Sequence, residues 1–79
     1  MTNEMRSKAI ELAASYLANW KASAAALEPD EERDYRNRYE GAMRMAALLG
    51  IEESEIEATA WRLWGDEIKQ AFEANNATW

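Results

Sequence analysis

Two short interruptions divide this sequence into three segments, and they constrain its fold more than any other feature. The first interruption, Glu28-Pro29-Asp30, contains the only proline, and the second runs from Gly50 to Ser54. Proline disfavours helix at the residue before it and suits the first turn of a following helix. Glycine suits the left-handed conformation that ends a helix. A chain of 79 residues interrupted in this way has room for one small domain.

Each segment has apolar residues at the spacing of an amphipathic helix, and none alternates like a strand. We predict helices over about residues 4–27, 30–49 and 55–74, followed by a short tail at 75–79. Thr2 or Asn3 suits the cap of the first helix, and Ser54 with Glu57 has the spacing of a capping box at the start of the third. Short connections favour an up-down-up order, so residues 1–79 are predicted to form an all-α, compact three-helix bundle.

The composition excludes several classes of function. Cysteine and histidine are both missing, which removes disulfides, thiolate zinc sites and imidazole groups for catalysis or metal binding. We therefore expect no enzyme activity, no cofactor and no metal site. No run of about 18 apolar residues is present, and the first residues lack the apolar stretch of a signal peptide. We expect a cytoplasmic protein that does not bind membranes.

The connection between the second and third segments resembles a helix-turn-helix over about residues 42–64. Ala46, Gly50 and Ile56 have the small-residue, turn-glycine and apolar spacings of that motif. The resemblance implies a helix-turn-helix-like connection, and DNA binding is one function of that motif. Binding to DNA needs lysine or arginine against phosphate, whereas this region is rich in glutamate. We interpret the motif as packing geometry and expect no direct binding to nucleic acid.

Acidic residues are concentrated in the last third of the chain. Of the net charge of −6, residues 51–79 carry −5. Four of them surround the predicted start of the third helix: Glu52, Glu53, Glu55 and Glu57. Two interpretations are open. These carboxylates complement the positive end of the helix dipole, or they form an acidic surface that occupies a basic groove of another protein in place of nucleic acid.

The third segment has a wider apolar arc than one neighbouring helix covers. Trp61, Ile68 and Phe72 lie along one edge of this arc, and Glu67 lies within it. Either the helix packs against both of the others, or part of the arc binds a partner, because tryptophan is a frequent anchor of interfaces. Glu67 then lies at the solvent edge or pairs with a basic residue of this chain or another. Trp61 and the tail residue Trp79 are the first candidates for exposed anchors.

These observations favour a small acidic module that binds another protein, one with a basic surface. Its size, charge and helicity are similar to those of the small acidic inhibitors and regulators that phages and mobile elements encode. Two alternatives stay open. One is a structural homodimer that buries Trp61, Ile68 and Phe72 between two copies of the chain. The other is a nucleic-acid binder of the helix-turn-helix type.

Overall fold

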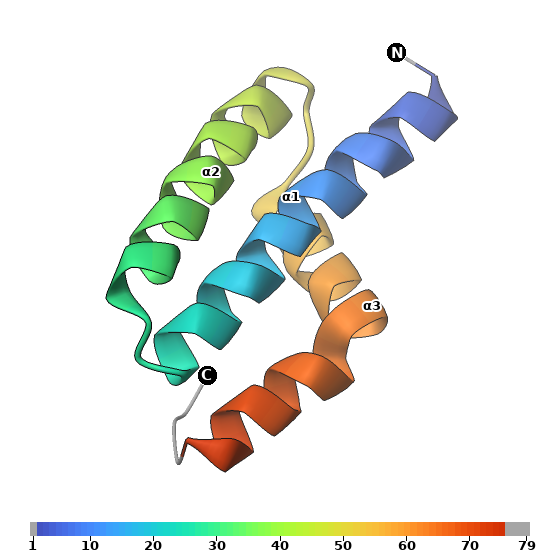
Figure 1. Ribbon diagram of the computed structural model, residues 1–79. Coiled ribbons are helices and arrows are strands. Elements are labelled where there is room, and N and C mark those ends of the chain that lie inside the picture. Colours follow the sequence, from blue (N-terminus) through green and yellow to red (C-terminus); the bar gives the residue numbers. More distant parts are fainter. Residues whose placement is uncertain (1, 76–79) are drawn as a thin grey trace.

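The chain folds into three helices joined by short connections (Figure 1). A computed structural model describes residues 2–75, in which α1 spans Asn3–Ala25, α2 spans Pro29–Leu48 and α3 spans Glu53–Ala74. The predicted all-α three-helix bundle is confirmed, and the helix bounds agree with prediction to within about two residues. None of the helices in residues 2–75 is long and apolar enough to cross a membrane.

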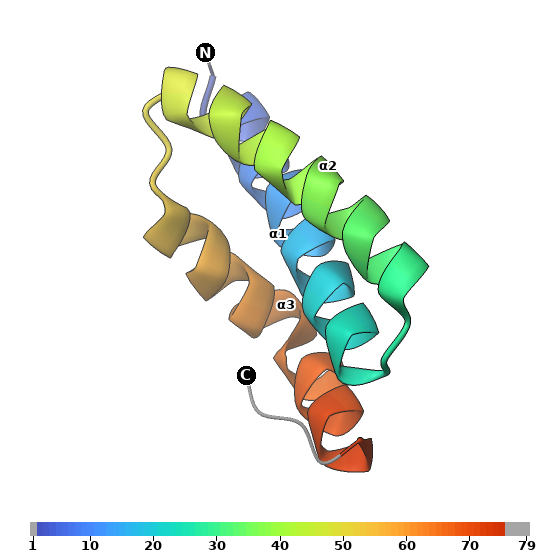
Figure 2. The same ribbon diagram turned by 90° about the vertical axis from the view of Figure 1, so that its left-hand side faces the viewer.

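Helix α1 lies in the middle, and α2 and α3 both pack against it (Figures 1 and 2). Contact between α2 and α3 themselves is slight. Ala46 of α2 and Ile56 of α3 belong to the same buried cluster, whose other members include Ile10 and Leu17 of α1. The structure thus contains the short connection that the sequence predicts, but the packing of α2 on α3 that a helix-turn-helix-like connection requires is not shown.

The helix ends follow from a few local residues. The Thr2 hydroxyl oxygen accepts a hydrogen bond of 3.1 Å from the Met5 backbone N–H, which caps α1 as predicted. Helix α1 ends two residues before the predicted limit because Leu27 adopts a left-handed conformation, with φ of 55°. Pro29 opens α2, and Gly50 follows its last turn with φ of 74°. Both interruptions in the sequence therefore act as turns.

The buried residues form two clusters along α1. The first joins all three helices and the α2–α3 connection, and its members are Ile10, Ala13, Ala14, Leu17, Tyr39, Ala46, Ile51, Ile56 and Ala60. The second joins only α1 and α3 and consists of Ala18, Ala25, Ile68 and Phe72. Trp64 is half-buried and packs against both clusters. This side chain therefore links the two parts of the core.

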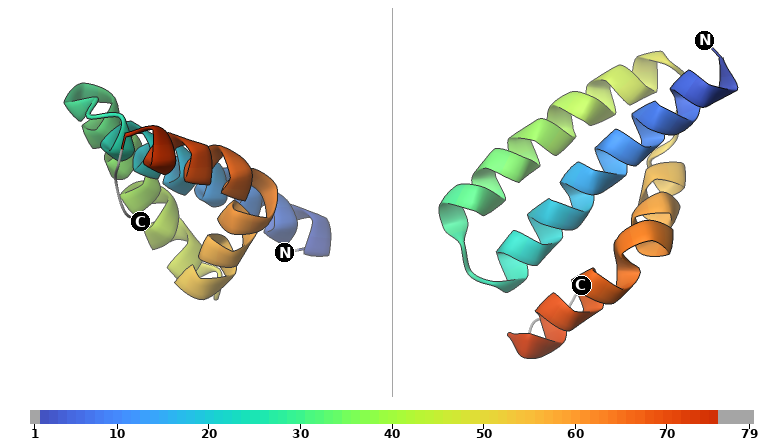
Figure 3. Two further views of the ribbon diagram at one scale, coloured as in Figure 1. Left: turned by 90° about the horizontal axis from the view of Figure 1, so that it is seen from below. Right: turned by 45° about the vertical axis from the view of Figure 1, so that its right-hand side comes forward.

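Helix α3 bends at Trp64, where the backbone leaves the helical region with φ of −129° and ψ of 16° (Figure 3, right). Its apolar residues on the α1 side recur at every fourth position from Ile56 to Phe72. In a straight helix, four residues advance by about 40° more than one full turn. Ile56 and Phe72 are four such steps apart, so their side chains would point about 160° away from each other. The bend, next to the weak helix former Gly65, allows both halves of α3 to face α1.

Removing a buried isoleucine should destabilise the bundle strongly. Ile56 and Ile68 are the largest fully buried side chains, one in each cluster. We expect Ile56→Ala or Ile68→Ala to lower the free energy of unfolding by about 2–5 kcal/mol, as measured by urea denaturation. Leu27→Ala is the control, because Leu27 is 84% exposed, and its effect should stay within about 0.5 kcal/mol. Equal effects of core and control variants would contradict the assigned core.

Replacement of Gly41 and of Gly50 by alanine should change the free energy of unfolding in opposite directions. A Cβ at Gly41, inside α2, would meet nothing within 4 Å, whereas Gly50 has a positive φ. Gly41→Ala should therefore stabilise the chain by about 0.5–1 kcal/mol through helix propensity. Gly50→Ala should destabilise it by about 1 kcal/mol because a side chain strains that conformation. Urea denaturation of both variants at low micromolar concentration checks the two signs.

Candidate protein-binding surfaces

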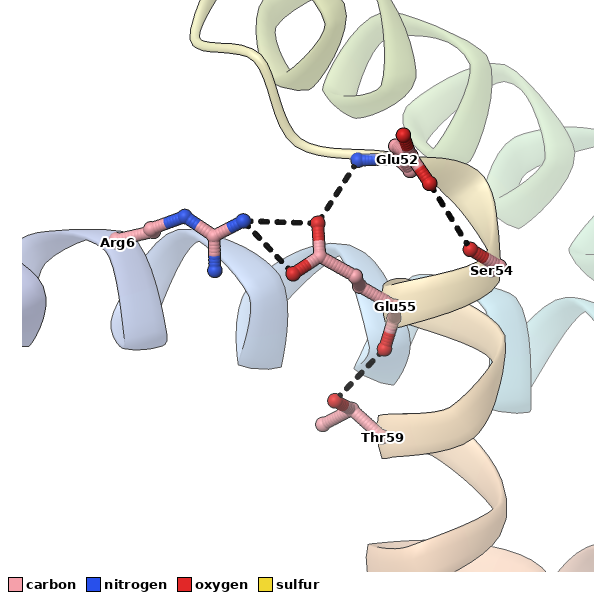
Figure 4. Close-up of polar contacts among 5 residues, drawn as sticks. All are labelled: Arg6, Glu52, Ser54, Glu55 and Thr59. Carbon is pink, nitrogen blue, oxygen red and sulfur yellow. Dashed lines mark hydrogen bonds and ion pairs between the residues drawn. The ribbon is translucent and has the colours of Figure 1, made fainter.

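The start of α3 is held in place by a hydrogen-bond network that also reaches α1 (Figure 4). The Glu55 carboxylate accepts hydrogen bonds of 2.7 and 2.8 Å from the Arg6 guanidinium of α1. It also accepts one of 3.0 Å from the Glu52 backbone N–H, while the Ser54 hydroxyl lies 3.5 Å from a Glu52 carboxylate oxygen. At the next turn, the Thr59 hydroxyl donates to the Glu55 carbonyl at 2.9 Å.

This network corrects the predicted capping residues. The cap of α3 is Glu52, with Glu55 three residues later, instead of Ser54 with Glu57. The two pairs have equal spacing, and the earlier one prevails because Glu55 also reaches Arg6. The sequence leaves open whether Glu52 and Glu55 complement the start of the helix or bind a partner, and the structure gives both a role at the helix start. The Arg6 hydrogen bonds and the Glu52 N–H hold the pKa of Glu55 below its usual range.

Glu53 and Glu57 are exposed and lie near Tyr39 of α2. The Tyr39 hydroxyl donates a long hydrogen bond of 3.4 Å to the Glu53 carboxylate. Burial raises the pKa of Tyr39, and the negative charges of Glu53 and Glu57 raise it further. Within residues 2–75, neither glutamate forms an ion pair with a lysine or arginine. The two carboxylates therefore contribute a negative potential beside the start of α3.

Trp61 is exposed on α3, as the sequence predicts, with 42% of its surface accessible. The helix places it one turn after Glu57 and one turn before Gly65, where a Cβ would lie only 3.2 Å from its ring. The missing side chain at Gly65 thus allows the indole to lie close to the helix backbone. Ile68 and Phe72, grouped with Trp61 in the sequence, are buried inside this chain instead. Trp79 lies outside the described residues.

Glu67 occupies the solvent edge of the bundle. It is exposed and lines a shallow cavity of about 340 Å³ between α1 and α3, together with polar Ser15 and Asn19 and the half-buried Trp64. A straight helix would place Glu67 within the apolar arc, but the bend at Trp64 changes which residues of the second half face α1. Of the possibilities that the sequence leaves open, the structure shows the solvent-edge position.

An apolar groove between α1 and α2 has no counterpart among the predicted sites. Its volume is about 340 Å³, and it is open to solvent. We define the apolar groove by seven lining residues: Ala9, Leu12, Tyr16, Gly41, Ala42, Met45 and Leu49. Leu12 is 54% exposed and Met45 is 60% exposed. Met5 lies two turns before Leu12 on the same side of α1 and extends the apolar surface.

The sequence contains a signal for this groove. In α1 the apolar residues span a wide arc, with Met5 and Leu12 at one edge and Ile10 and Leu17 at the other. The last turns of α2 add Met45 and Leu49 beside the buried Ala46. An arc of about 100° is enough for one core-facing helix. The excess apolar width of these two neighbouring helices predicts an exposed seam between them.

Comparisons with known proteins identify no relative of this chain. No protein-family model, no curated protein sequence and no solved structure matches it. The geometry of the molecule is therefore the basis for any assignment of function.

Loss of the Glu55 charge should make stability depend less on pH. A lowered pKa means that the folded state favours the ionised carboxylate. Its contribution is therefore present above the usual glutamate range and is lost as the pH falls through the lowered pKa. We expect Glu55→Gln to unfold at a lower urea concentration than wild type at about pH 7, and at nearly the same concentration at about pH 2.5. Glu73→Gln, at the other end of α3, is the matched control and should match wild type at both values; an equal effect there would contradict the role of the Arg6 pair.

Proposed function

We propose that this chain is a small acidic module that binds a basic surface of another protein and thereby regulates or inhibits it. The observation that carries the proposal is an exposed tryptophan in line with two carboxylates on α3. Glu53, Glu57 and Trp61 are spaced by four residues, so they follow one side of the helix. We call these three residues the acidic ridge.

The acidic ridge combines two features of protein interfaces. Trp61 offers a large, amphipathic side chain of the kind that most often anchors a binding hot spot. The two carboxylates lie about 6 Å apart along the helix axis and sit in the part of the chain that carries −5 of the net charge of −6. Negative charge of this density attracts a basic partner and speeds association. In a narrower form of the proposal, the carboxylates take the place of nucleic-acid phosphates in the groove of such a partner.

The remaining predicted residues contribute less to this surface. Glu52 and Glu55 are engaged at the start of α3, and Glu67 opens onto a different side of that helix, towards α1. Regulation through binding, without catalysis, is consistent with a chain that lacks histidine and cysteine. Direct binding to DNA gains no support, because the first turn of α3 exposes Glu53 where a recognition helix needs cations.

The ridge can be tested by quantitative capture of partners from a lysate of the source cells. Trp61→Ala should weaken capture of the specific partner by about 30-fold, since loss of an anchor costs 2 kcal/mol or more. Glu53→Gln with Glu57→Gln should slow association and reduce its dependence on salt. Leu63→Ala is the matched control, because Leu63 is similarly exposed at 39% and lies on another side of α3. Partners that bind all the variants equally would contradict the proposed ridge.

A further inference from the structure

We propose that the apolar groove between α1 and α2 is an interface at which two copies of this chain form a dimer. The acidic ridge lies on α3, so the two proposals depend on different surfaces. Each proposal can therefore be contradicted without affecting the other, because different variants test them.

The groove exposes more apolar surface than a small monomer needs. Leu12, Met45 and Leu49 line it with between 44% and 60% of their surfaces accessible. Met5, two turns before Leu12 on the same side of α1, is 60% exposed. Contiguous apolar patches of this kind on soluble domains usually mark interaction surfaces. Covering the groove with a second chain would remove the side chains of Leu12, Met45 and Leu49 from water.

The floor of the groove is open to a second chain. Gly41 lies near the middle of α2, where a Cβ would meet nothing within 4 Å. The helix has no need of a glycine here, because the backbone has no positive φ and nothing approaches it closely. Glycine costs about 1 kcal/mol relative to alanine inside a helix. Together with the small side chains of Ala9 and Ala42, it leaves space for large residues of a partner.

The charges around the groove favour a second copy over a strongly charged partner. Lys8 pairs with Glu4 at 3.4 Å, one turn before Leu12, and Arg38, which lines the groove, pairs with Asp34 at 3.2 Å. Each pair has no net charge, although the whole chain carries −6. Two copies that meet at this face bring together balanced charges, whereas contact through the acidic α3 would bring together charges of the same sign.

The arrangement of α1 and α2 and the small core of a single chain also favour a dimer. Helices α1 and α2 lie side by side and run in opposite directions (Figure 1). Two copies of this α1–α2 pair, related by a two-fold axis, would form a four-helix bundle. The apolar groove of one chain then packs against the same groove of the other. Many core residues within one chain are alanines, and the largest fully buried side chains are Ile56 and Ile68. Small domains of this kind are marginally stable, and oligomerisation is a common supplement.

The expected dimer is weak. Specific interfaces usually bury about 1,200–2,000 Å² in total, and a surface that is two short helices wide lies at or below that range. We expect a dissociation constant in the micromolar range, roughly 1–100 μM. The thermal midpoint should therefore rise with protein concentration, since only the folded chain dimerises.

Sedimentation equilibrium of the full chain from about 5 μM to about 1 mM tests this directly. The wild-type mass should rise from 9.0 kDa towards twice that value. Leu12→Glu should raise the dissociation constant at least tenfold, because it places a charge in the apolar groove. Gly41→Leu should do the same by filling the groove, with no loss of monomer stability because the site is open and leucine is a good helix former.

Leu63→Glu supplies the matched control, an exposed leucine of α3 outside the groove, and should dimerise like wild type. A wild-type chain that stays monomeric throughout would overturn the proposal and leave the groove to a helix of a different protein. Dimers that persist in both Leu12→Glu and Gly41→Leu, or that Leu63→Glu disrupts equally, would also overturn it. Circular dichroism of each variant identifies any that fails to fold, and the Gly41 variant keeps the test decisive in that case.

Discussion

The packing of α1 against both α2 and α3 determines where these two helices lie in the fold. On the side that faces α3, α1 places alanines at every fourth position, including Ala14 and Ala18, and these small side chains let the two helices approach closely. On the side that faces α2, Trp20 stacks at a tilt on Tyr39, with ring centroids 5.6 Å apart. Because α2 and α3 hardly touch, each is held in place mainly through α1. The Arg6–Glu55 pair adds a polar link at the start of α3.

Much of this fold follows from the sequence by local rules. Pro29 and Gly50 fix the two turns because each restricts the backbone in a way that needs no knowledge of the tertiary structure. The bend at Trp64 does not follow in this way, since a single helical wheel assumes a straight helix. The choice of Glu52 over Ser54 as the cap is similarly tertiary, because it depends on Arg6, which is 49 residues from Glu55 along the chain.

Only part of the binding surface predicted on α3 is exposed in the structure, and the bend at Trp64 explains which part. Exposure of Trp61 follows from its position at the edge of the apolar arc, which the bend leaves unchanged. Ile68 and Phe72 lie past the bend, where the arc turns towards α1, and they are buried. The apolar groove was not predicted because it is shared between two helices, and periodicity within one helix does not show which seams a third helix leaves open. Excess apolar width on adjacent helices is the signal to seek in similar sequences.

The bend in α3 also divides the molecule into parts of unequal stability. The first half of α3 belongs to the larger cluster, which all three helices share, whereas the second half rests on a small cluster formed with α1 alone. Local opening of a protein follows such differences in buried contact. The second half of α3 should therefore separate at a lower free-energy cost than the first half. Glu53, Glu57 and Trp61 precede the bend, so the surface that they form does not depend on the packing of the second half of α3.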